Sequence, residues 1–365
     1  MDEPKYVFVI VTVVYVFVFI FGVLGNVLVI YVVCTLRDML TPTNIFLVNL
    51  SVADLLVLLV CMPSSLVEFH AREVWLLGAA MCKMTPLLEH TVAHTSILTI
   101  LAISFERYYA ICNPFEVLYA CTKRRAMKII SCIWIFSIAA ALPLFFMTET
   151  RRTKHLSGEM VIICRTPVRG ELRVGFILVK MFMLFLLPLV ILVVLYAIIC
   201  RRLRRHVLKT TLRTHGSRRQ VIYMLITIIV LFFICLFPIK IMTLWSIFSS
   251  SQDKKAMGLE GYLIVLSFTR VMFYMNSAGN PVLYNIVSTK FRNACRRAMG
   301  CGKQPLQKTG SISRQYTHVT GSRRPSRTDF QETNRQDYKR SQERIAMASV
   351  IHVSNHLNSK DIVEC

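Results

Sequence analysis

The sequence has few charged residues, and few of these are acidic. Asp, Glu, Lys and Arg make up 17% of the chain and 55% is hydrophobic, whereas soluble domains are about one quarter charged. The 43 Lys and Arg outnumber the 20 Asp and Glu, which gives a formal net charge of +23. The basic residues lie in loops and a tail between apolar runs, where they more often fix membrane orientation than bind nucleic acid. The composition therefore excludes an ordinary soluble domain and argues against a nucleic-acid partner.

The sequence also lacks any motif for metal binding or catalysis. It has twelve cysteines, but no CxxC pair with a matching second pair and no recognisable set of nucleophile, base and orienting group. Several cysteines lie inside apolar runs, where they act as small buried hydrophobes, among them Cys34, Cys61, Cys132 and Cys235. We therefore expect neither an enzyme nor a tightly bound cofactor.

Long apolar runs separate the polar stretches. A chain crosses the hydrocarbon layer of a membrane with about 20 mostly apolar residues, which form a helix because no water is present to satisfy the backbone. Seven such runs are present: 6–34, 44–67, 79–112, 125–147, 173–200, 221–249 and 260–286. The sequence therefore predicts an all-α membrane protein, with a seven-transmembrane helix bundle over residues 6–288.

The two ends of the chain differ from this bundle. Residues 1–5 form a short N-terminus without the positive region of a signal peptide, so we interpret the first run as a retained helix. Residues 289–301 place Lys and Arg on one side, which predicts an amphipathic helix along the inner membrane face. Residues 302–365 are rich in Ser, Thr, Arg, Gln and Asn, and predict a disordered tail.

The charge of the loops predicts the topology. Basic residues without any acid fill the loops at 201–219 and 120–128, so these loops and the tail should be cytoplasmic and the N-terminus outside. The loop at 148–173 is also basic, although it falls on the outer side. Attraction of an acidic ligand or lipid is one explanation of this surplus.

Several polar side chains interrupt the apolar runs, where they are costly and therefore candidates for function. Asp54 lies in the second run, and neutral polar residues that could surround it lie in three others: Asn26, Ser96, Asn276 and Asn280. A carboxylate with such partners suits a small cation, and an isolated buried carboxylate would tend to protonate. Helix packing is the alternative for each residue taken alone.

A charged tripeptide ends the third run. Glu106 and Arg107 precede Tyr108 at the membrane edge. An arginine in this position can exchange its carboxylate partner when a helix moves, which would make it a switch. The alternative is an arginine that extends its charged end to the interface from a helix terminus.

Prolines in the later runs predict hinges. Pro281 follows Asn280 in the seventh run, so the helix can kink there, and Tyr284 lies about one turn from Asn280 on the same face. Pro188 and Pro238 give two further hinges in the fifth and sixth runs.

Together these residues resemble the rhodopsin-like (class A) G-protein-coupled receptors. Matching residues occur in the family's order over about 6–300: Gly25, Asn26, Asn49 to Asp54, Trp75, Cys82, Glu106 to Tyr108, Trp134, Pro188, Tyr196, Phe232, Pro238, Asn280, Pro281, Tyr284 and Phe291. Cys82 precedes Arg107 by 25 residues, which is the family's spacing. Within the family the chain is similar to the branch of ghrelin, neuromedin U and thyrotropin-releasing-hormone receptors. It looks most like ecdysis-triggering-hormone receptors in five stretches: 73–78, 89–94, 100–109, 243–245 and 274–278.

The resemblance implies a plasma-membrane receptor for an extracellular neuropeptide. The peptide would have an amidated C-terminus, and the receptor would activate a heterotrimeric G protein, with Gq and calcium release favoured. Receptor kinases and arrestin would act on Ser and Thr residues of the tail. Apart from the resemblance, the position of Cys295 and Cys301 at the amphipathic helix makes them candidates for palmitoylation.

The resemblance also implies roles for individual residues. Cys82 should form a disulfide with Cys164, and the family's allosteric sodium site should be formed by Asp54, Ser96, Asn276 and Asn280. Arg107 should engage the G protein once the sixth helix moves outward. Tyr196 and Tyr284 should support that active state.

Two departures from the family pattern concern the sixth helix. Many members place Trp after the helix-six cysteine, but here Leu236 follows Cys235, so the aromatic role is absent or shared with Phe232 and Phe237. Many members also place an acid at the foot of this helix, where this chain has Arg218. Glu106 is then the main partner of Arg107, and we expect appreciable ligand-independent signalling.

Charged and polar residues near the outer ends of the helices predict the ligand site: Glu89, His90, Lys240, Arg270 and Tyr274. This set combines an acid with cations, as a peptide with charged side chains requires. A mutual ion pair between Glu89 and Arg270 is the alternative.

Other functions on the same residues have less support. A retinal receptor would need Lys where Tyr274 stands, and a monoamine receptor would need Asp where this chain has Glu89. A secondary transporter would be expected to show inverted repeats between its halves, and none is evident. A transporter and a receptor for a small non-peptide ligand remain the alternatives.

Overall fold

The computed structural model describes residues 5–300 apart from residues 73 and 169 and the segments 113–121, 155–158 and 208–211. The side chains of 204–219 and of a few residues near 221 and 251–260 lie outside this description. The chain divides into two units, Met1–Pro305 and Leu306–Cys365. The predicted tail at 302–365 lies outside the described residues.

Seven helical rods form the described bundle, and two of them contain a π-helical turn. The elements are α1 (Lys5–Thr35); α2 (Pro42–Leu56), η2 (Val57–Cys61) and α3 (Met62–His70); α4 (Gly78–Cys112); α6 (Lys123–Met147); α7 (Glu171–Met181), η3 (Phe182–Leu186) and α8 (Leu187–Val207); α9 (Leu212–Phe248); and α10 (Ser251–Val287). Two short helices, η1 (Arg37–Met39) and α11 (Thr289–Ala298), complete the helical part. Six of the rods, all except α10, are long and apolar enough among the described residues to cross a membrane. The predicted seven-helix bundle is confirmed.

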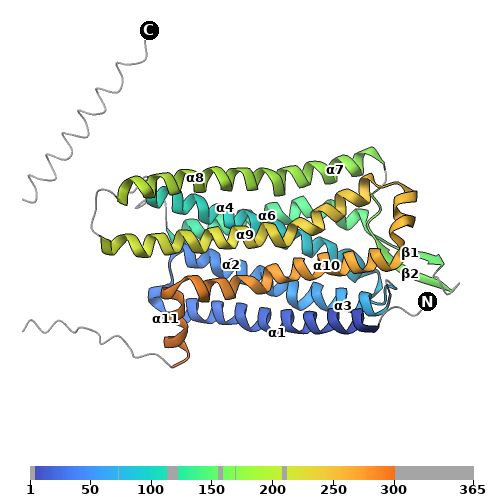
Figure 1. Ribbon diagram of the computed structural model, residues 1–365, viewed down its shortest axis with the longest axis horizontal. Coiled ribbons are helices and arrows are strands. Elements are labelled where there is room, and N and C mark those ends of the chain that lie inside the picture. The colour runs from blue at the N-terminus through green and yellow to red at the C-terminus, as the bar shows by residue number, and fades with distance from the viewer. Residues whose placement is uncertain are drawn as a thin grey trace, which may run out of the picture. The chain divides into compact units, whose positions relative to one another are not determined.

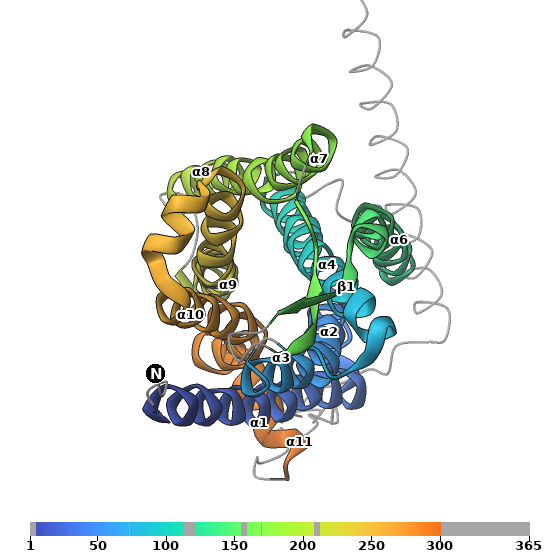
Figure 2. The ribbon, with the colours of Figure 1, turned by 90° about the vertical axis from the view of Figure 1, so that its right-hand side faces the viewer.

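The rods run side by side along the long axis of the bundle (Figure 1). The first residues of α1 lie at the same end as a hairpin of β1 (Glu149–Lys154) and β2 (Met160–Arg165), and α11 lies at the opposite end. We call these the hairpin end and the α11 end. Viewed from the hairpin end, the rods surround a centre over which β1 lies (Figure 2).

Prolines and caps account for the local irregularities of the rods. A proline follows each π-helical turn by two residues. Pro63 follows η2, which ends at Cys61, and Pro188 follows η3, which ends at Leu186. Because proline cannot donate to the preceding turn, the helix loses a bond there, and a wider turn accommodates the change. The seventh rod begins at Ser251 rather than at the predicted 260 because Ser250 forms a capping box with Asp253. Gly258, at φ 69°, then bends the rod.

Polar side chains join the rods inside the bundle. Asn49 of α2 donates to Thr99 of α4 over 2.9 Å and accepts from the Trp134 indole of α6 over 2.8 Å. The Asn26 amide of α1 donates to the Ser277 carbonyl of α10 over 2.9 Å. Each bond satisfies a polar group that would be costly in an apolar interior. Asn26 in the first apolar run and Asn49 in the second therefore link helices.

The outside of the bundle is apolar. Large hydrophobic side chains face outward from α1 and α6, including Phe17, Ile135 and Phe146, which are 57%, 69% and 74% exposed. A continuous exposed apolar surface of this kind would aggregate in water, whereas lipid covers it without cost. The burial pattern is that of a membrane protein.

The α11 helix is fixed against the end of the bundle. Phe291, Ala294 and Cys295 are at most 3% exposed and pack into the hydrophobic core. On its other face Arg297 donates to Asp38 in the first loop over 2.7 Å. This bond holds the pKa of the Asp38 carboxyl below its ordinary value, so the pair persists above that lowered pKa and is lost only as the pH falls through it. The amphipathic helix predicted at 289–301 is present as Thr289–Ala298.

Gly25 is required for the contact between α1 and α10. A Cβ atom on Gly25 would lie 2.8 Å from Cβ of Pro281, and a proline ring cannot rotate away. We expect Gly25→Ala to destabilise the protein by about 1–3 kcal/mol through overpacking, measured as a lower apparent Tm in detergent. Gly175→Ala is the control, because a Cβ there meets nothing within 4 Å; an equal Tm for both variants would contradict the prediction.

Candidate functional site

The β1–β2 hairpin is attached to the bundle at the start of α4 and at the segment between α3 and α4. A disulfide joins Cys82 of α4 to Cys164 of β2, which confirms the predicted pairing. The backbone N–H of Trp75 donates to the Ile162 carbonyl over 2.7 Å, and its indole donates to the Gly78 carbonyl over 2.6 Å. The hairpin itself was not predicted. Its strands pair antiparallel, with Thr150 opposite Cys164.

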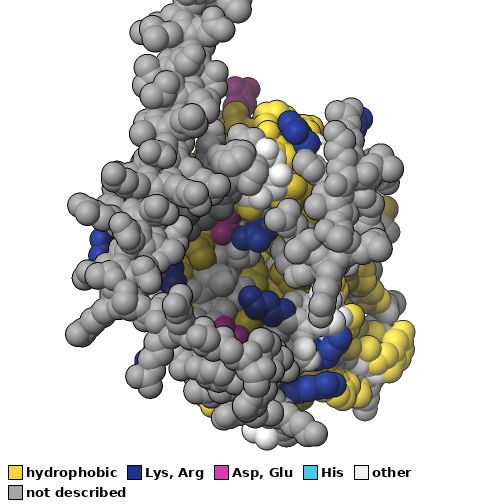
Figure 3. Space-filling view, turned by 90° about the vertical axis from the view of Figure 1, so that its left-hand side faces the viewer, with side chains coloured by type: hydrophobic (Ala, Val, Ile, Leu, Met, Phe, Trp, Pro, Cys, Tyr) yellow, Lys and Arg dark blue, Asp and Glu magenta, His cyan; other side chains and the backbone are white. Residues whose placement is uncertain are grey.

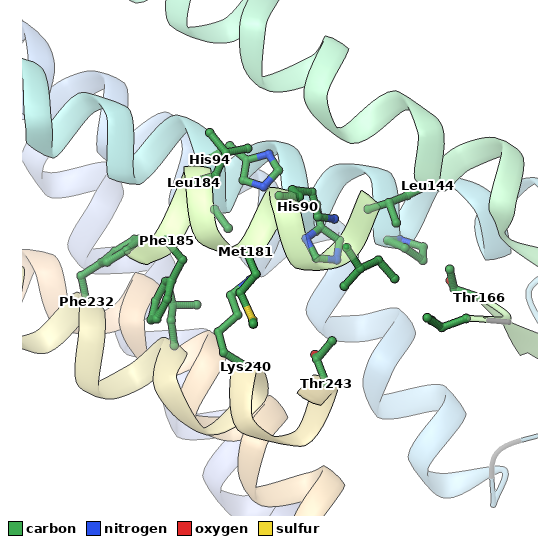
Figure 4. A pocket seen from close by; sticks show the side chains of 16 residues that line it. His90, His94, Leu144, Thr166, Met181, Leu184, Phe185, Phe232, Lys240 and Thr243 are labelled. Carbon is green, nitrogen blue, oxygen red and sulfur yellow. The ribbon is translucent and has the colours of Figure 1, made fainter. Parts of the chain in front are cut away.

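Below the hairpin a cavity of about 160 Å³ lies between α4, α7 and α9. Figure 4 shows His90 and His94 on α4, with Lys240 and Phe232 of α9 and Phe185 of η3 facing them across the cavity. Thr166, in the segment after β2, lines the side toward the hairpin end. The cavity therefore lies toward the hairpin end of the bundle.

Basic side chains from three helices line this cavity: His90, His94, Lys180 and Lys240. The two imidazole rings are 6.0 Å apart between centroids. The Lys180 ammonium lies 5.4 Å from the centre of the Phe176 ring, and that of Lys240 lies 5.7 Å from the centre of the Phe185 ring. Both lysines therefore make cation–π contacts, and no acid is among the described lining residues.

A second charged cluster lies between α3, α4 and α10. Arg270 of α10 forms a 2.7 Å ion pair with Glu68 of α3. One turn further, the Tyr274 hydroxyl makes a 2.8 Å contact with Glu89 and a 2.9 Å contact with Ser65. We call the group formed by Glu68, Ser65, Glu89, Arg270 and Tyr274 the acidic cluster.

The alternative of a mutual Glu89–Arg270 ion pair is wrong for the described structure. The hydrogen-bonded carboxylate of Arg270 is Glu68, and the Glu89 carboxylate accepts from Tyr274. The reason is the position of α3, which places a second acid beside Arg270. Glu89 remains close enough to interact electrostatically with Arg270.

The five residues predicted to bind the ligand therefore fall into two places. His90 and Lys240 line the cavity, whereas Glu89, Arg270 and Tyr274 belong to the acidic cluster. Glu89 and His90 separate because successive residues of an α-helix project about 100° apart. Together the two places present basic and acidic groups.

Sequence reasoning missed Glu68, His94 and Lys180 as members of these sites. Lys180 lies within the fifth apolar run, and Glu68 lies just past the predicted end of the second. An ionisable residue in or near an apolar span is by itself a candidate for function. The signal was present, but the helix faces that bring these residues together are a property of the fold.

Midway along the bundle, Asp54 is fully buried and accepts a 2.9 Å bond from the Asn280 amide. Ser277 also interacts with this carboxyl. Three of the residues predicted to bind sodium have a buried oxygen without a hydrogen-bond partner among the described residues: Oδ1 of Asp54, Oγ of Ser96 and Oδ1 of Asn276. Such a set of oxygens suits a hard cation.

Near the α11 end, Arg107 and Glu106 form an ion pair of 3.1 Å. The Thr43 hydroxyl of α2 lies 3.0 and 2.9 Å from the two carboxylate oxygens of Glu106, and Arg107 also donates to it. The next residue, Tyr108, packs edge-on against Tyr109, with ring centroids 5.7 Å apart. Thr43 is a partner that sequence reasoning missed.

Both tyrosines predicted to support the active state are buried. The hydroxyl of Tyr196 in α8 accepts from Ser104 over 3.3 Å, and Tyr284 packs edge-on against Phe291, with ring centroids 5.9 Å apart. Pro238 and Pro281 lie inside α9 and α10, as expected for hinges.

The foot of α9 is bonded to the junction of α10 and α11. The Gln220 amide donates to the Val287 carbonyl over 2.6 Å and accepts from the Thr289 hydroxyl over 2.8 Å. These bonds join helix six to the end of helix seven. The side chain of Arg218, two residues earlier, lies outside the described part of the chain.

The burial of side chains bears on two further predictions, the aromatic role of Phe237 and lipid attachment at Cys295. Leu236 and Phe232 are each 2% exposed and line the cavity, whereas Phe237 is 55% exposed and faces outward. The suggestion that Phe237 shares the aromatic role is therefore wrong. Cys295 is 3% exposed in the core, which opposes lipid attachment there in this conformation. Cys301 lies outside the described residues.

Comparison with known families decides the class of the molecule. The family model of the 7 transmembrane receptor (rhodopsin family) matches residues 25–284. The chain belongs to this family. Membership makes it a multi-pass membrane receptor and not an enzyme, and the matched region contains the cavity, the acidic cluster and the Glu106–Arg107 pair.

Receptors named for peptides and hormones are among the relatives of this family member. It is 34% identical to Neuromedin-U receptor 2 of Mus musculus over 287 residues, which cover 76% of this chain and 72% of the relative. It is 30% identical to a QRFP-like peptide receptor of Branchiostoma floridae, covering 77% of this chain and 74% of the relative. It is 29% identical to the Thyrotropin-releasing hormone receptor of Bos taurus, covering 80% and 78%.

Proposed function

We propose that the chain is a plasma-membrane receptor for an extracellular neuropeptide and that it activates a heterotrimeric G protein. The observation that supports a peptide most directly is the likeness to receptors named for neuromedin U, a QRFP-like peptide and thyrotropin-releasing hormone. The charges at the hairpin end agree with it. A peptide has charged groups at several points, and the basic cavity and the acidic cluster give complementary places for them.

The proposed orientation places the hairpin end outside and the α11 end in the cytoplasm. Lys and Arg side chains lie around the α11 end (Figure 3). Exposed examples are Lys123, Arg124, Arg125, Lys128, Arg201, Arg202, Lys290 and Arg296. Basic residues near membrane helices favour the cytoplasmic side, and the G protein would bind there next to Arg107. The tail would meet receptor kinases and arrestin on the same side.

The proposal is tested by recording calcium in cells that express the receptor while a library of amidated neuropeptides is added. We expect at least one peptide to raise calcium in these cells and not in the parent cells, and a Gq inhibitor to abolish the response. A panel of G-protein activation sensors, read in parallel, would identify another subtype if calcium stays unchanged. Surface-expressed receptor that no peptide activates through any G protein would contradict the proposal.

We further propose that sodium binds at Asp54 and favours the resting state. The Asp54 carboxylate and the oxygens of Ser96 and Asn276, which have no partners among the described residues, are ligands that a hard cation prefers. Asn280 would help to position the carboxylate through its 2.9 Å bond. Replacing sodium by choline should raise ligand-independent signalling of the wild type but not of Asp54→Asn; an equal rise in both would contradict a site at Asp54.

A further inference from the structure

The cavity below the hairpin has positive charge without an internal counter-ion. Lys180 is 9% exposed, and Lys240 lines the same cavity. Burial makes an uncompensated charge expensive, and a ring face is a weaker partner for an ammonium than a carboxylate is. Each lysine has only the ring contact described above as a favourable partner among the described residues.

The acids of the described bundle interior are already occupied by other partners. Glu68 pairs with Arg270 and Glu106 with Arg107. Asp54 accepts from Asn280, and Glu89 accepts from Tyr274. None of these acids therefore serves as a counter-ion for the two lysines.

The four basic residues of the cavity act on one another. The positive charges of Lys240 and Lys180 repel each other, and both disfavour a positive charge on His90 and His94. The residues lie on three different helices, α4, α7 and α9. A single anion at their centre would neutralise the repulsion and join the three helices.

The size and lining of the cavity restrict the anion. A volume of about 160 Å³ is below the roughly 300 Å³ of sites for drug-sized ligands, so it fits one side chain rather than a whole ligand. Apolar groups line the rest of the wall: Leu144, Ile177, Met181 and Leu184. These surround an aliphatic stem better than a fully hydrated phosphate or sulfate. A carboxylate on a short hydrocarbon chain fits both features.

We propose that this cavity binds the carboxylate of an acidic side chain of the peptide ligand, between Lys180 and Lys240, with His90 and His94 as further donors. The proposal rests on the proposed peptide receptor. An amidated C-terminus has no charge, so the anion is then an Asp or Glu side chain. A free C-terminal carboxylate has the same chemistry, and the experiment must separate the two sources.

The first experiment uses single-residue probes and the purified full-length receptor. N-acetylglutamate amide has the side-chain carboxylate, N-acetylglutamine amide is its neutral match, and N-acetylalanine has only a terminal carboxylate. We expect N-acetylglutamate amide, at concentrations on the order of 10 mM, to raise the Tm more than either other probe, because a ligand that binds only the folded state stabilises it. Equal Tm values with the glutamate and glutamine probes would overturn the proposal. A larger rise with N-acetylalanine would overturn the assignment to a side chain.

Variants identify the lysines. Lys180→Gln with Lys240→Gln should remove the difference between the probes, and this double variant should fold because it removes two buried charges that repel each other. Lys83→Gln is the matched control, because its ammonium lies over Phe145, which is not among the cavity-lining residues. A probe difference that survives in a folded double variant would overturn the site.

The second experiment uses a peptide that activates the receptor in the calcium assay. Replacing its critical Glu or Asp by Gln or Asn should lower potency roughly 30-fold or more on the wild type and have little effect on the double variant. A peptide that keeps full potency when every acid is neutralised would overturn the cavity proposal and leave the receptor function intact. A probe-dependent Tm rise in a receptor that no peptide activates would support the cavity and contradict the peptide function.

Discussion

Arg270→Ala is expected to lower the free energy of unfolding by about 3 kcal/mol, since it leaves a partly buried carboxylate without its partner. Glu68 would lose the 2.7 Å ion pair, and its side chain is only 13% exposed. The nearby Glu89 carboxylate would also lose the attraction of the guanidinium. In detergent this should appear as a fall of several degrees in the apparent Tm.

A double variant separates lost stability from lost ligand binding. Glu68→Gln combined with Arg270→Gln removes both charges, so it should recover most of the Tm that Arg270→Ala loses. If the acidic cluster also binds peptide, the double variant should be stable yet respond to an active peptide only at higher concentration. A Tm for Arg270→Ala equal to that of the wild type would show that the ion pair contributes nothing. Full potency of both Glu89→Gln and Arg270→Ala would remove the acidic cluster from the ligand site.

Gln220→Ala is expected to raise ligand-independent signalling roughly fivefold or more. Gln220 makes two bonds to the α10–α11 junction, and outward movement of α9 would have to break them. Two hydrogen bonds contribute about 1–3 kcal/mol together, which corresponds to a change of about 5- to 150-fold in an equilibrium between resting and active states. The measurement is G-protein activation without ligand, at equal surface expression.

Thr289→Val provides the graded control for this prediction. It removes one of the two bonds and leaves the bond from Gln220 to the Val287 carbonyl. Its effect should therefore be smaller than that of Gln220→Ala. Unchanged basal signalling in both variants would contradict a role for Gln220 in stabilising the resting state.

The wild type itself should signal above receptor-free cells, because Arg218 replaces the acid that many family members have at the foot of helix six. Equal signals in cells with and without the receptor would contradict that expectation.

The fold was predictable because its signals are local or regular. Seven apolar runs define the helices, and ordered residues such as Asn26, Asp54 and Pro281 define the family. The disulfide followed from the same resemblance. The hairpin was not predictable in this way. Its strands, Glu149–Lys154 and Met160–Arg165, have only 6 residues each, and the first is polar. The disulfide and the contact with Trp75 position the second strand on the bundle.

The site was predictable by residue type but not by partner. Ionisable residues in the spans could be identified as functional candidates, but helix rotation decides what each one faces. Glu89 and His90 are neighbours in sequence and belong to separate clusters. The Arg270 partner is 202 positions away in the chain, and the Thr43 contact with Arg107 spans 64 positions. Such pairings depend on how the helices pack against one another, and the spacing of residues in a single sequence does not reveal this.

The contacts of α11 with the bundle hold the end of helix seven (α10) in place beside the foot of helix six (α9). Ser288 caps the short helix, three of its side chains are buried in the core, and Arg297 bonds it to the first loop. Among the described residues, α11 packs against α10 and α1, its Arg297 pairs with Asp38 of η1, and its Thr289 bonds to Gln220 of α9. If helix six (α9) turns about Pro238 on activation, the two bonds from Gln220 to Val287 and Thr289 would have to break. These bonds would then favour the resting state in place of an acid at the foot of helix six.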